Sequence, residues 1–195
     1  MGDRSEQDAT AAVIESQKRF YDLRAPDYLT GAASDRVGAK PDQGMPADTR
    51  RQLVDEVLPF SAVLELGCGP GGFTRELARH ASEVTALDAA PRMLERNRLE
   101  VGASNVRYVE ADLFDWEPGT TYDLVFFGFV VSHIPPDRFD TFWDLVRRCL
   151  MPTGRVAFVD EARRVAHYDD VRVEHGIPLA RRRLVDGREF DIVKV

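Results

Sequence analysis

The stretch Ala62-Val-Leu-Glu-Leu-Gly-Cys-Gly-Pro-Gly-Gly-Phe-Thr74 decides the fold of this chain. Val63 to Leu66 is a short apolar run that predicts a buried strand, and Phe73 to His80 predict a helix. Between them lies a glycine-rich turn, where the backbone can bend sharply and lie close to a ligand because no Cβ intervenes. A strand, a glycine turn and a helix in this order open a nucleotide-binding α/β unit.

Glu65, just before the turn, narrows the choice of ligand. The spacing Gly67-x-Gly69-x-x-Gly72 fits the dinucleotide fingerprint, so an NAD(P)-dependent oxidoreductase is one interpretation. A carboxylate at position 65 would repel a pyrophosphate and attract a cation. S-adenosylmethionine has an ammonium, a sulfonium and no phosphate, so the sequence favours it as the cofactor.

Length and composition limit the classes of protein to which this chain can belong. With 195 residues, of which 44% are hydrophobic, the chain predicts a single domain. We divide it into an N-terminal helix with a lid-like segment, residues 1–46, and a catalytic domain, residues 47–195. The net charge of -7 disfavours nucleic acid and anionic membranes as partners. Cys68 and Cys149 form no metal-binding spacing, and without a signal peptide they predict a cytoplasmic protein that needs no metal.

Predicted strands and helices alternate along the chain. This pattern predicts a Rossmann-like α/β fold, a doubly wound, mostly parallel sheet with helices on both faces. The predicted strands are 62–66, 83–88, 105–110, 122–131 and 155–160. The other predictions are a frayed 1–8, a helix over 9–23, a loop over 24–46, a helix over 49–57 capped by Asp48, helices over 72–80, 91–101 and 137–150, a partly helical 162–176, and two strands within 181–195 joined by an Asp186-Gly187 turn.

Ligands of such sheets bind at the carboxyl ends of the strands, where the strand order reverses. Asp88 and Asp160 end predicted strands, and Asp112 and His133 follow predicted strands closely. We therefore expect these polar side chains to gather at one edge of the sheet.

Five ordered motifs resemble those of the class I S-adenosylmethionine-dependent methyltransferases. They are Leu64-Glu-Leu-Gly-Cys-Gly-Pro-Gly-Gly72, Val84-Thr-Ala-Leu-Asp88, Glu110-Ala-Asp-Leu-Phe114, Tyr122-Asp-Leu-Val125 and Leu150-Met-Pro-Thr-Gly-Arg155. The resemblance covers residues 48–161 and implies methyl transfer from S-adenosylmethionine to an oxygen, nitrogen or carbon of a small-molecule acceptor. A methyltransferase-like binding protein without activity is the alternative.

The resemblance also implies the roles of individual residues. Glu65, Gly67 and Gly69 would surround the methionine part of the cofactor. Asp88 would bind the ribose hydroxyls, and Asp112 would accept a hydrogen bond from the adenine amino group. The other positions expected beside the cofactor are Cys68, Gly71, Ala89, Met93, Leu113 and Phe129.

Methyl transfer is an in-line displacement that requires positioning and removal of a proton from the nucleophile. His133 is the candidate base, and Asp160 would orient its imidazole or bind the acceptor. The alternative is that His133 only shapes the pocket. Tyr21 and Tyr28 flank the loop and are candidates for a lid over the acceptor, or else anchors that pack the first helix onto the domain.

The C-terminal sequence departs from the family pattern. The family's sheet finishes with a strand, a helix and a last strand that form a reversed hairpin. Here only the first of these is expected, near Phe190 to Val195, so we expect an incomplete hairpin at the edge of the sheet. The basic run Arg181-Arg-Arg183 is either a solvated strand face or a binding surface for an acidic substrate. The oligomeric state is not specified by any motif.

Overall fold

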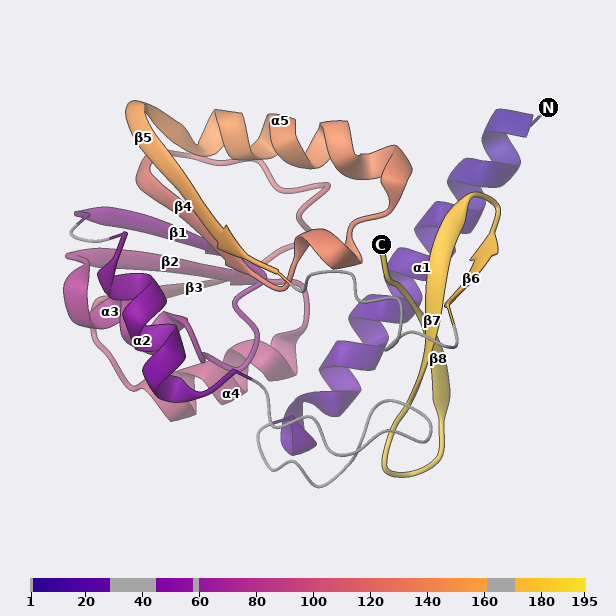
Figure 1. The fold of residues 1–195 in the computed structure, drawn as a ribbon, viewed down its shortest axis with the longest axis horizontal. Helices are drawn as coiled ribbons and strands as arrows, with labels where there is room; N and C mark the ends of the chain where they lie inside the picture. Colours follow the sequence, from indigo (N-terminus) through magenta and orange to yellow (C-terminus); the bar gives the residue numbers. More distant parts are fainter. Residues whose placement is uncertain (1, 29–44, 58–59, 161–170) are drawn as a thin grey trace.

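The computed structural model describes residues 2–28, 45–57, 60–160 and 171–195 (Figure 1). Its centre is a five-stranded parallel sheet in the order β3-β2-β1-β4-β5. The strands are β1 (Ala62–Leu66), β2 (Glu83–Asp88), β3 (Val106–Glu110), β4 (Tyr122–Gly128) and β5 (Leu150–Val159). The order reverses between β1 and β4, which confirms the predicted doubly wound topology.

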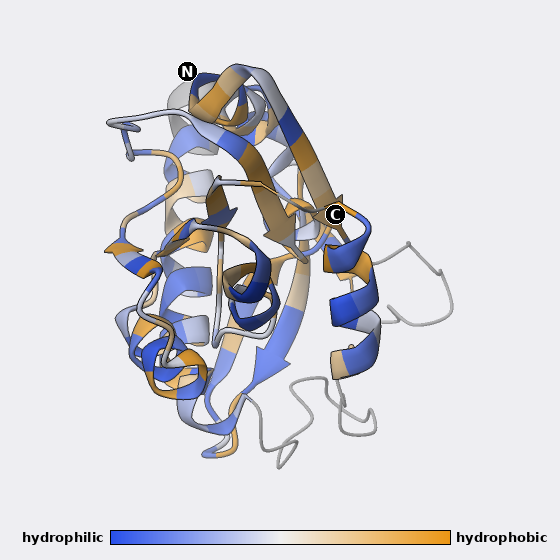
Figure 2. Ribbon diagram, turned by 90° about the vertical axis from the view of Figure 1, so that its left-hand side faces the viewer, coloured by the Kyte–Doolittle hydropathy of each residue, from blue (hydrophilic) through white to orange (hydrophobic). Residues whose placement is uncertain are grey.

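Helices cover both faces of this sheet. On one face lie α2 (Ala47–Asp55), α3 (Thr74–His80) and α4 (Pro91–Val101), and on the other lies α5 (Phe139–Cys149). The strands β1 and β4 are buried by both layers, as their continuous apolar sequences predict. In Figure 2 the hydrophobic colours are concentrated in the central strands, whereas the helices carry hydrophobic and hydrophilic residues on different sides.

The C-terminal region forms a second sheet and does not extend the first one. β6 (Val171–Glu174), β7 (Ile177–Arg183) and β8 (Glu189–Val193) are antiparallel in the order β6-β7-β8. Among the described residues, the main sheet therefore lacks the complete hairpin, as expected, but the strand expected at its edge near Phe190 to Val195 lies in this second sheet. The predicted Asp186-Gly187 turn is confirmed, because Gly187 has φ +89 and its N–H donates to the carbonyl of Leu184 at 2.9 Å.

This second sheet packs on the long first helix, α1 (Gly2–Arg24). Phe20 is fully buried against Ala180 and Ile192, and Val13 is buried against Leu179. These contacts explain the unexpected topology, because they bury the apolar side chains of both segments. Together α1, β7 and β8 form a cap that lies beyond the carboxyl ends of the parallel strands (Figure 1).

Several predicted boundaries are wrong. α1 begins at Gly2, so residues 2–8 are helical and not frayed. Asp48 lies in the first turn of α2 and makes no side-chain capping bond, because the helix already begins after Pro46. β4 ends at Gly128, since Phe129 leaves the strand with φ +60, and Val171 to Glu174 form a strand where part of a helix was expected. The loop prediction for 29–44, the stop at Pro59 and the predictions for 161–170 lie outside the described residues.

Candidate active site

The glycine turn after β1 has the backbone conformation that its sequence requires. Gly67, Gly69 and Gly71 have φ values of +63, +51 and +99, which residues with a Cβ rarely adopt. A Cβ on Gly67 would lie 2.7 Å from Cγ2 of Val130, so the turn also packs closely against the end of β4. A Cβ on Gly69 would meet no atom within 4 Å, so this position is open toward a ligand.

Asp88 joins the end of β2 to this turn. Its Oδ2 accepts the N–H of Gly69 at 2.8 Å, and its Oδ1 accepts the N–H of Ala90 at 2.9 Å. Burial raises the pKa of Asp88, whereas the hydrogen bonds from Ala90 and Gly69 act in the opposite direction. Each carboxylate oxygen keeps a further lone pair, which suits the pair of ribose hydroxyls that the sequence predicted for this residue.

Glu65 lies behind the turn and not on its surface. Only 2% of the residue is exposed, and its Oε2 accepts the hydroxyl of Thr74 at 2.6 Å. Burial raises the pKa of Glu65 to about 8, although the hydrogen bond from Thr74 favours the ionised form. A cation placed near this carboxylate would favour its ionisation.

Asp112 lies at the opposite end of the predicted cofactor site. Its Oδ1 accepts the N–H of Phe114 at 2.9 Å, and its Oδ2 pairs with Nζ of Lys18 at 3.0 Å. Lys18 belongs to α1, so the cap reaches the position at which the sequence predicted adenine binding. Burial acts to lower the pKa of Lys18, but its hydrogen bonds with Glu15 and Asp112 raise it.

The remaining predicted cofactor residues lie around the same strand ends. The side chain of Cys68 packs inward against Ala86 and Leu94, so only its backbone faces the turn. Met93 is buried beside Ala90, next to Tyr21 and Tyr28. Ala89 and Leu113 directly follow Asp88 and Asp112, and Phe129, with its left-handed φ, contacts Phe73 with ring centroids 6.3 Å apart.

The donor set fits S-adenosylmethionine. Three carboxylates, those of Glu65, Asp88 and Asp112, come from β1 and from the ends of β2 and β3 around the glycine turn. They suit a ligand with two cationic centres, a ribose and an amino-substituted base, and they would repel phosphates. Among the described residues, no group of three or more His, Cys, Asp or Glu side chains could hold a metal ion.

On the other side of the strand ends, His133 and Tyr21 form a hydrogen-bonded pair. Nδ1 of His133 lies 2.8 Å from the carbonyl oxygen of Val193, and Nε2 lies 3.0 Å from the Tyr21 hydroxyl. Because a carbonyl can only accept, Nδ1 carries the hydrogen and Nε2 accepts that of Tyr21. Burial, reinforced by the charge of Lys194, lowers the pKa of His133 to about 4, so its imidazole is neutral at physiological pH.

The side chain of Gln17 on α1 binds the main chain of His133 and of Val193, and so helps to hold this pair in place. Its Nε2 donates to the carbonyl of His133 at 3.1 Å, and its Oε1 accepts the N–H of Val193 at 3.1 Å. The carboxylate of Asp160 binds the main chain next to His133, because its Oδ2 accepts the N–H of Ser132 at 3.0 Å. The structure therefore places Asp160 at the backbone before His133. Tyr28 lies under the guanidinium of Arg24, 4.4 Å from its ring centroid.

Two buried cations lie beside His133; the sequence analysis missed Lys194 and named Arg182 only as part of the basic run 181–183. Arg182 of β7 and Lys194 just after β8 are each only 7% exposed, and Nζ of Lys194 lies 3.2 Å from Oγ of Ser132. Both positive charges act to lower the pKa of His133, which places them near its ring.

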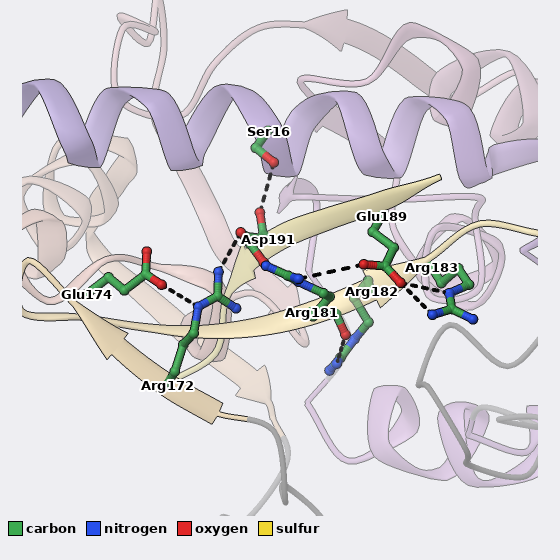
Figure 3. A network of polar contacts seen from close by, with 8 residues as sticks. All are labelled: Ser16, Arg172, Glu174, Arg181, Arg182, Arg183, Glu189 and Asp191. Atoms are coloured by element: carbon green, nitrogen blue, oxygen red, sulfur yellow. Dashed lines mark hydrogen bonds and ion pairs between the residues drawn. The ribbon is translucent and has the colours of Figure 1, made fainter. Parts of the chain in front are cut away.

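Alternation along β7 separates Arg182 from its neighbours. Arg181 and Arg183 are exposed and pair with acids of the neighbouring strand β8 (Figure 3). Arg181 pairs with Glu189 and Asp191, and Arg183 pairs with Glu189. Arg182 points to the other face because successive side chains of a strand alternate. The period-two rule, applied to the run 181–183, was the signal that could have identified the middle arginine.

Comparisons with known proteins agree with this geometry. The methyltransferase-domain family matches residues 63–154. DhpI, solved as a complex with S-adenosylhomocysteine, has a similar structure with 38% sequence identity and a TM-score of 0.71, over 94% of this chain and 80% of that one. The chain belongs to the class I S-adenosylmethionine-dependent methyltransferases. S-adenosylmethionine is accordingly the cofactor, and the oxidoreductase interpretation is excluded.

Relatives within the methyltransferases differ in their acceptors. Trans-aconitate 2-methyltransferase of Escherichia coli is 34% identical over 97 residues, which are 49% of this chain and 37% of that protein. A 23S rRNA (uracil(1939)-C(5))-methyltransferase of Alkalilimnicola ehrlichii is 39% identical over 101 residues, 46% of this chain and 23% of that one. The chain thus spans less than two fifths of the length of these curated relatives. Among the described helices, none is long and apolar enough to cross a membrane.

Proposed function

We propose that this chain transfers the methyl group of S-adenosylmethionine to an oxygen of a small anionic acceptor, such as a carboxylic or phosphonic acid. The observation that carries the proposal is the pair of buried cations, Arg182 and Lys194, beside His133 at the carboxyl ends of the strands. Both positive charges act on the same imidazole, so together they make the electrostatic potential at this place positive, which favours an anionic ligand. Neither side chain lacks protein partners, and the acceptor anion would join them.

The proposed acceptor explains why the histidine is such a weak base. When bound, S-adenosylmethionine supplies an electrophilic methyl on a positively charged sulfur. An ionised oxygen can attack it without losing a proton, whereas a hydroxyl or ammonium group needs a base. With a pKa of about 4 and Nε2 already bonded to Tyr21, His133 suits the first case.

In this proposal Arg182 and Lys194 bind the oxygens of the acid that do not react. His133 holds the hydroxyl of Tyr21 in place at the edge of the acceptor pocket, and Gln17 holds His133. Asp160 supports the backbone at Ser132, while Tyr28 packs the cap against Met93. Catalysis then consists of orientation and electrostatic stabilisation. The role of His133 as a base, transferring a proton through Tyr21, is the alternative for a hydroxyl acceptor.

Two further observations support a small acid. Trans-aconitate, the acceptor named for one relative, is itself a carboxylate. The net charge of -7 disfavours RNA, the acceptor named for the other. A cytoplasmic location remains our prediction for the chain.

The test is a screen of acceptors by release of S-adenosylhomocysteine. Trans-aconitate and short alkylphosphonates would be compared with matched neutral alcohols, amines and a 23S rRNA fragment. We expect turnover with at least one acid, and Arg182→Met to lower kcat/KM for it by about 100-fold, equivalent to a lost buried ion pair. Arg181→Met, on the exposed face of the same strand, is the matched control and should change kcat/KM less than twofold.

Two kinds of result would contradict the proposed function. Turnover with amines or RNA alone, or equal effects of Arg182→Met and Arg181→Met, would contradict an anionic acceptor. A well-folded protein that shows no heat of binding with S-adenosylhomocysteine would instead favour an inactive binding protein.

A further inference from the structure

Asn97 is a fully buried amide on α4, next to the cofactor turn. Its helix otherwise buries apolar side chains, Met93 and Leu94. An amide that is removed from water costs free energy unless its donors and acceptor are all satisfied. Its presence at this position therefore calls for a specific role.

The hydrogen bonds of Asn97 have a defined direction. Nδ2 donates to the carbonyl of Gly69 at 3.1 Å and to Oγ1 of Thr74 at 2.8 Å. Oδ1 accepts the hydroxyl of Tyr108 at 3.1 Å. Because Oγ1 of Thr74 already accepts from Asn97, its own hydrogen points to Oε2 of Glu65 at 2.6 Å. The result is a chain of donors that runs from Tyr108 through Asn97 and Thr74 and ends on the Glu65 carboxyl group.

The peptide of Gly69 is held from both sides. Asp88 accepts its N–H, and Asn97 donates to its carbonyl. The side chain of Asn97 also lies against the turn, because a Cβ on Gly71 would be 2.8 Å from Oδ1. Gly69 is the position at which the turn is open toward a ligand, so Asn97 stabilises the backbone at the point of cofactor contact.

We propose that Asn97 is a positioning residue for the cofactor, which fixes the Gly69 peptide directly and the Glu65 carboxylate through Thr74. Asn97 itself touches no ligand. Donors in series strengthen one another, so each bond in the chain makes Glu65 a better partner for a cationic ligand. This role concerns the cofactor alone and does not depend on the nature of the acceptor.

The isosteric pair Thr74→Val and Thr74→Ser tests the proposal in the full-length chain. Calorimetric titration with S-adenosylhomocysteine measures Kd, and thermal unfolding measures stability. Valine keeps the shape of threonine but loses the hydroxyl, and we expect Kd to rise by about tenfold. Serine keeps the hydroxyl and should restore Kd to within about threefold of the wild type.

Asn97→Ala should raise Kd by about 20-fold, because both anchored groups are released. In the double variant, Asn97→Ala with Thr74→Val, Kd should rise by less than the product of the two single increases, since both residues belong to one chain of hydrogen bonds. Leu145→Ala on α5, fully buried in the core on the other face of the sheet, is the control for lost stability and should leave Kd within twofold.

Two results would overturn the role of Asn97. One is that Asn97→Ala changes Kd no more than Leu145→Ala does at a similar loss of stability. The other is that the serine and valine variants of Thr74 bind equally weakly. If Asn97→Ala does not fold, the Thr74 pair decides alone. Inactivity toward acids, which would contradict the proposed function, leaves these binding measurements unaffected.

Discussion

The two sides of the candidate site are built in different ways. The expected cofactor side comes from one continuous segment: Glu65 lies in β1, Asp88 ends β2, and Asp112 follows β3, three neighbouring strands of the parallel sheet. The side that we propose for the acceptor is assembled from α1 and from β7 and β8, which lie far apart in the sequence. The cofactor side is therefore specified by local motifs, whereas the acceptor side depends on contacts between distant segments.

The sharpest way to separate the two sides is Asp88→Ala. We expect the Kd for S-adenosylhomocysteine to rise by 100-fold or more, because the ribose loses its partner and the N–H groups of Gly69 and Ala90 lose their acceptor. Calorimetry measures this, with Glu83→Ala, exposed at the start of the same strand, as the matched control. A Kd within threefold of the wild type would remove Asp88 from the cofactor site.

On the acceptor side, Tyr21→Phe should leave cofactor affinity unchanged and lower kcat by about tenfold with the best acid found. The ring packing on Phe20 is kept, but Nε2 of His133 loses its donor. Steady-state kinetics measure the effect, and Tyr28→Phe serves as the control. A rise in the Kd for S-adenosylhomocysteine, with kcat unchanged, would show that Tyr21 belongs to the cofactor side.

The stability that each side contributes also changes with pH in opposite directions, and Glu65 gives the larger change in stability. Its pKa is raised to about 8 in the folded state, so stability is lost as pH rises from the unfolded value near 4.5 toward 8. The slope can reach about 1.4 kcal/mol per pH unit. Glu65→Gln should therefore stabilise the cofactor-free protein at pH 8 and flatten this part of the curve of melting temperature against pH. An identical pH dependence in both proteins would contradict the buried carboxyl group.

His133 gives the smaller effect. Its pKa is lowered to about 4, so stability is present above the unfolded value near 6.5 and is lost as pH falls from there to 4. His133→Gln should reduce this loss, which denaturant titrations at pH 5 and pH 7 would measure. His80, which is exposed and pairs with Asp55, is the control position. An equal loss in the wild type and in His133→Gln would show that this ring is not held neutral by the fold.

The sequence predicted the strands of the main sheet and the glycine turn well because the information for them is local. A glycine turn, an acidic residue at a strand end and an apolar run are each set by a few neighbouring residues. The cap could not be predicted in this way. The choice between a hairpin on the main sheet and a separate sheet depends on how Phe20 and Val13 of α1 pack with residues far along the chain.

Arg182 and Lys194 illustrate the same limit at the level of single residues. Between two exposed arginines, Arg182 looks like part of a solvated face until the register with β8 is known. Lys194 lies beside Ser132 because tertiary hydrogen bonds hold the chain on both sides of it: Gln17 and His133 bind Val193, and the N–H of Val195 donates to the carbonyl of Ser132 at 3.0 Å. Sequence periodicity gives the face of a strand, but tertiary contacts decide which face is buried.

The partnership of α1 with β8 also has a consequence for the order of folding. Gln17 and Val193 are hydrogen-bonded across 176 positions of the sequence, so α1 is synthesised well before β8, its partner strand. Contacts of such high sequence separation form slowly, and a nascent chain exposes Val13 and Phe20 throughout synthesis. The parallel sheet can close earlier. All strands of the main sheet are synthesised before β7 and β8, the strands that complete the cap.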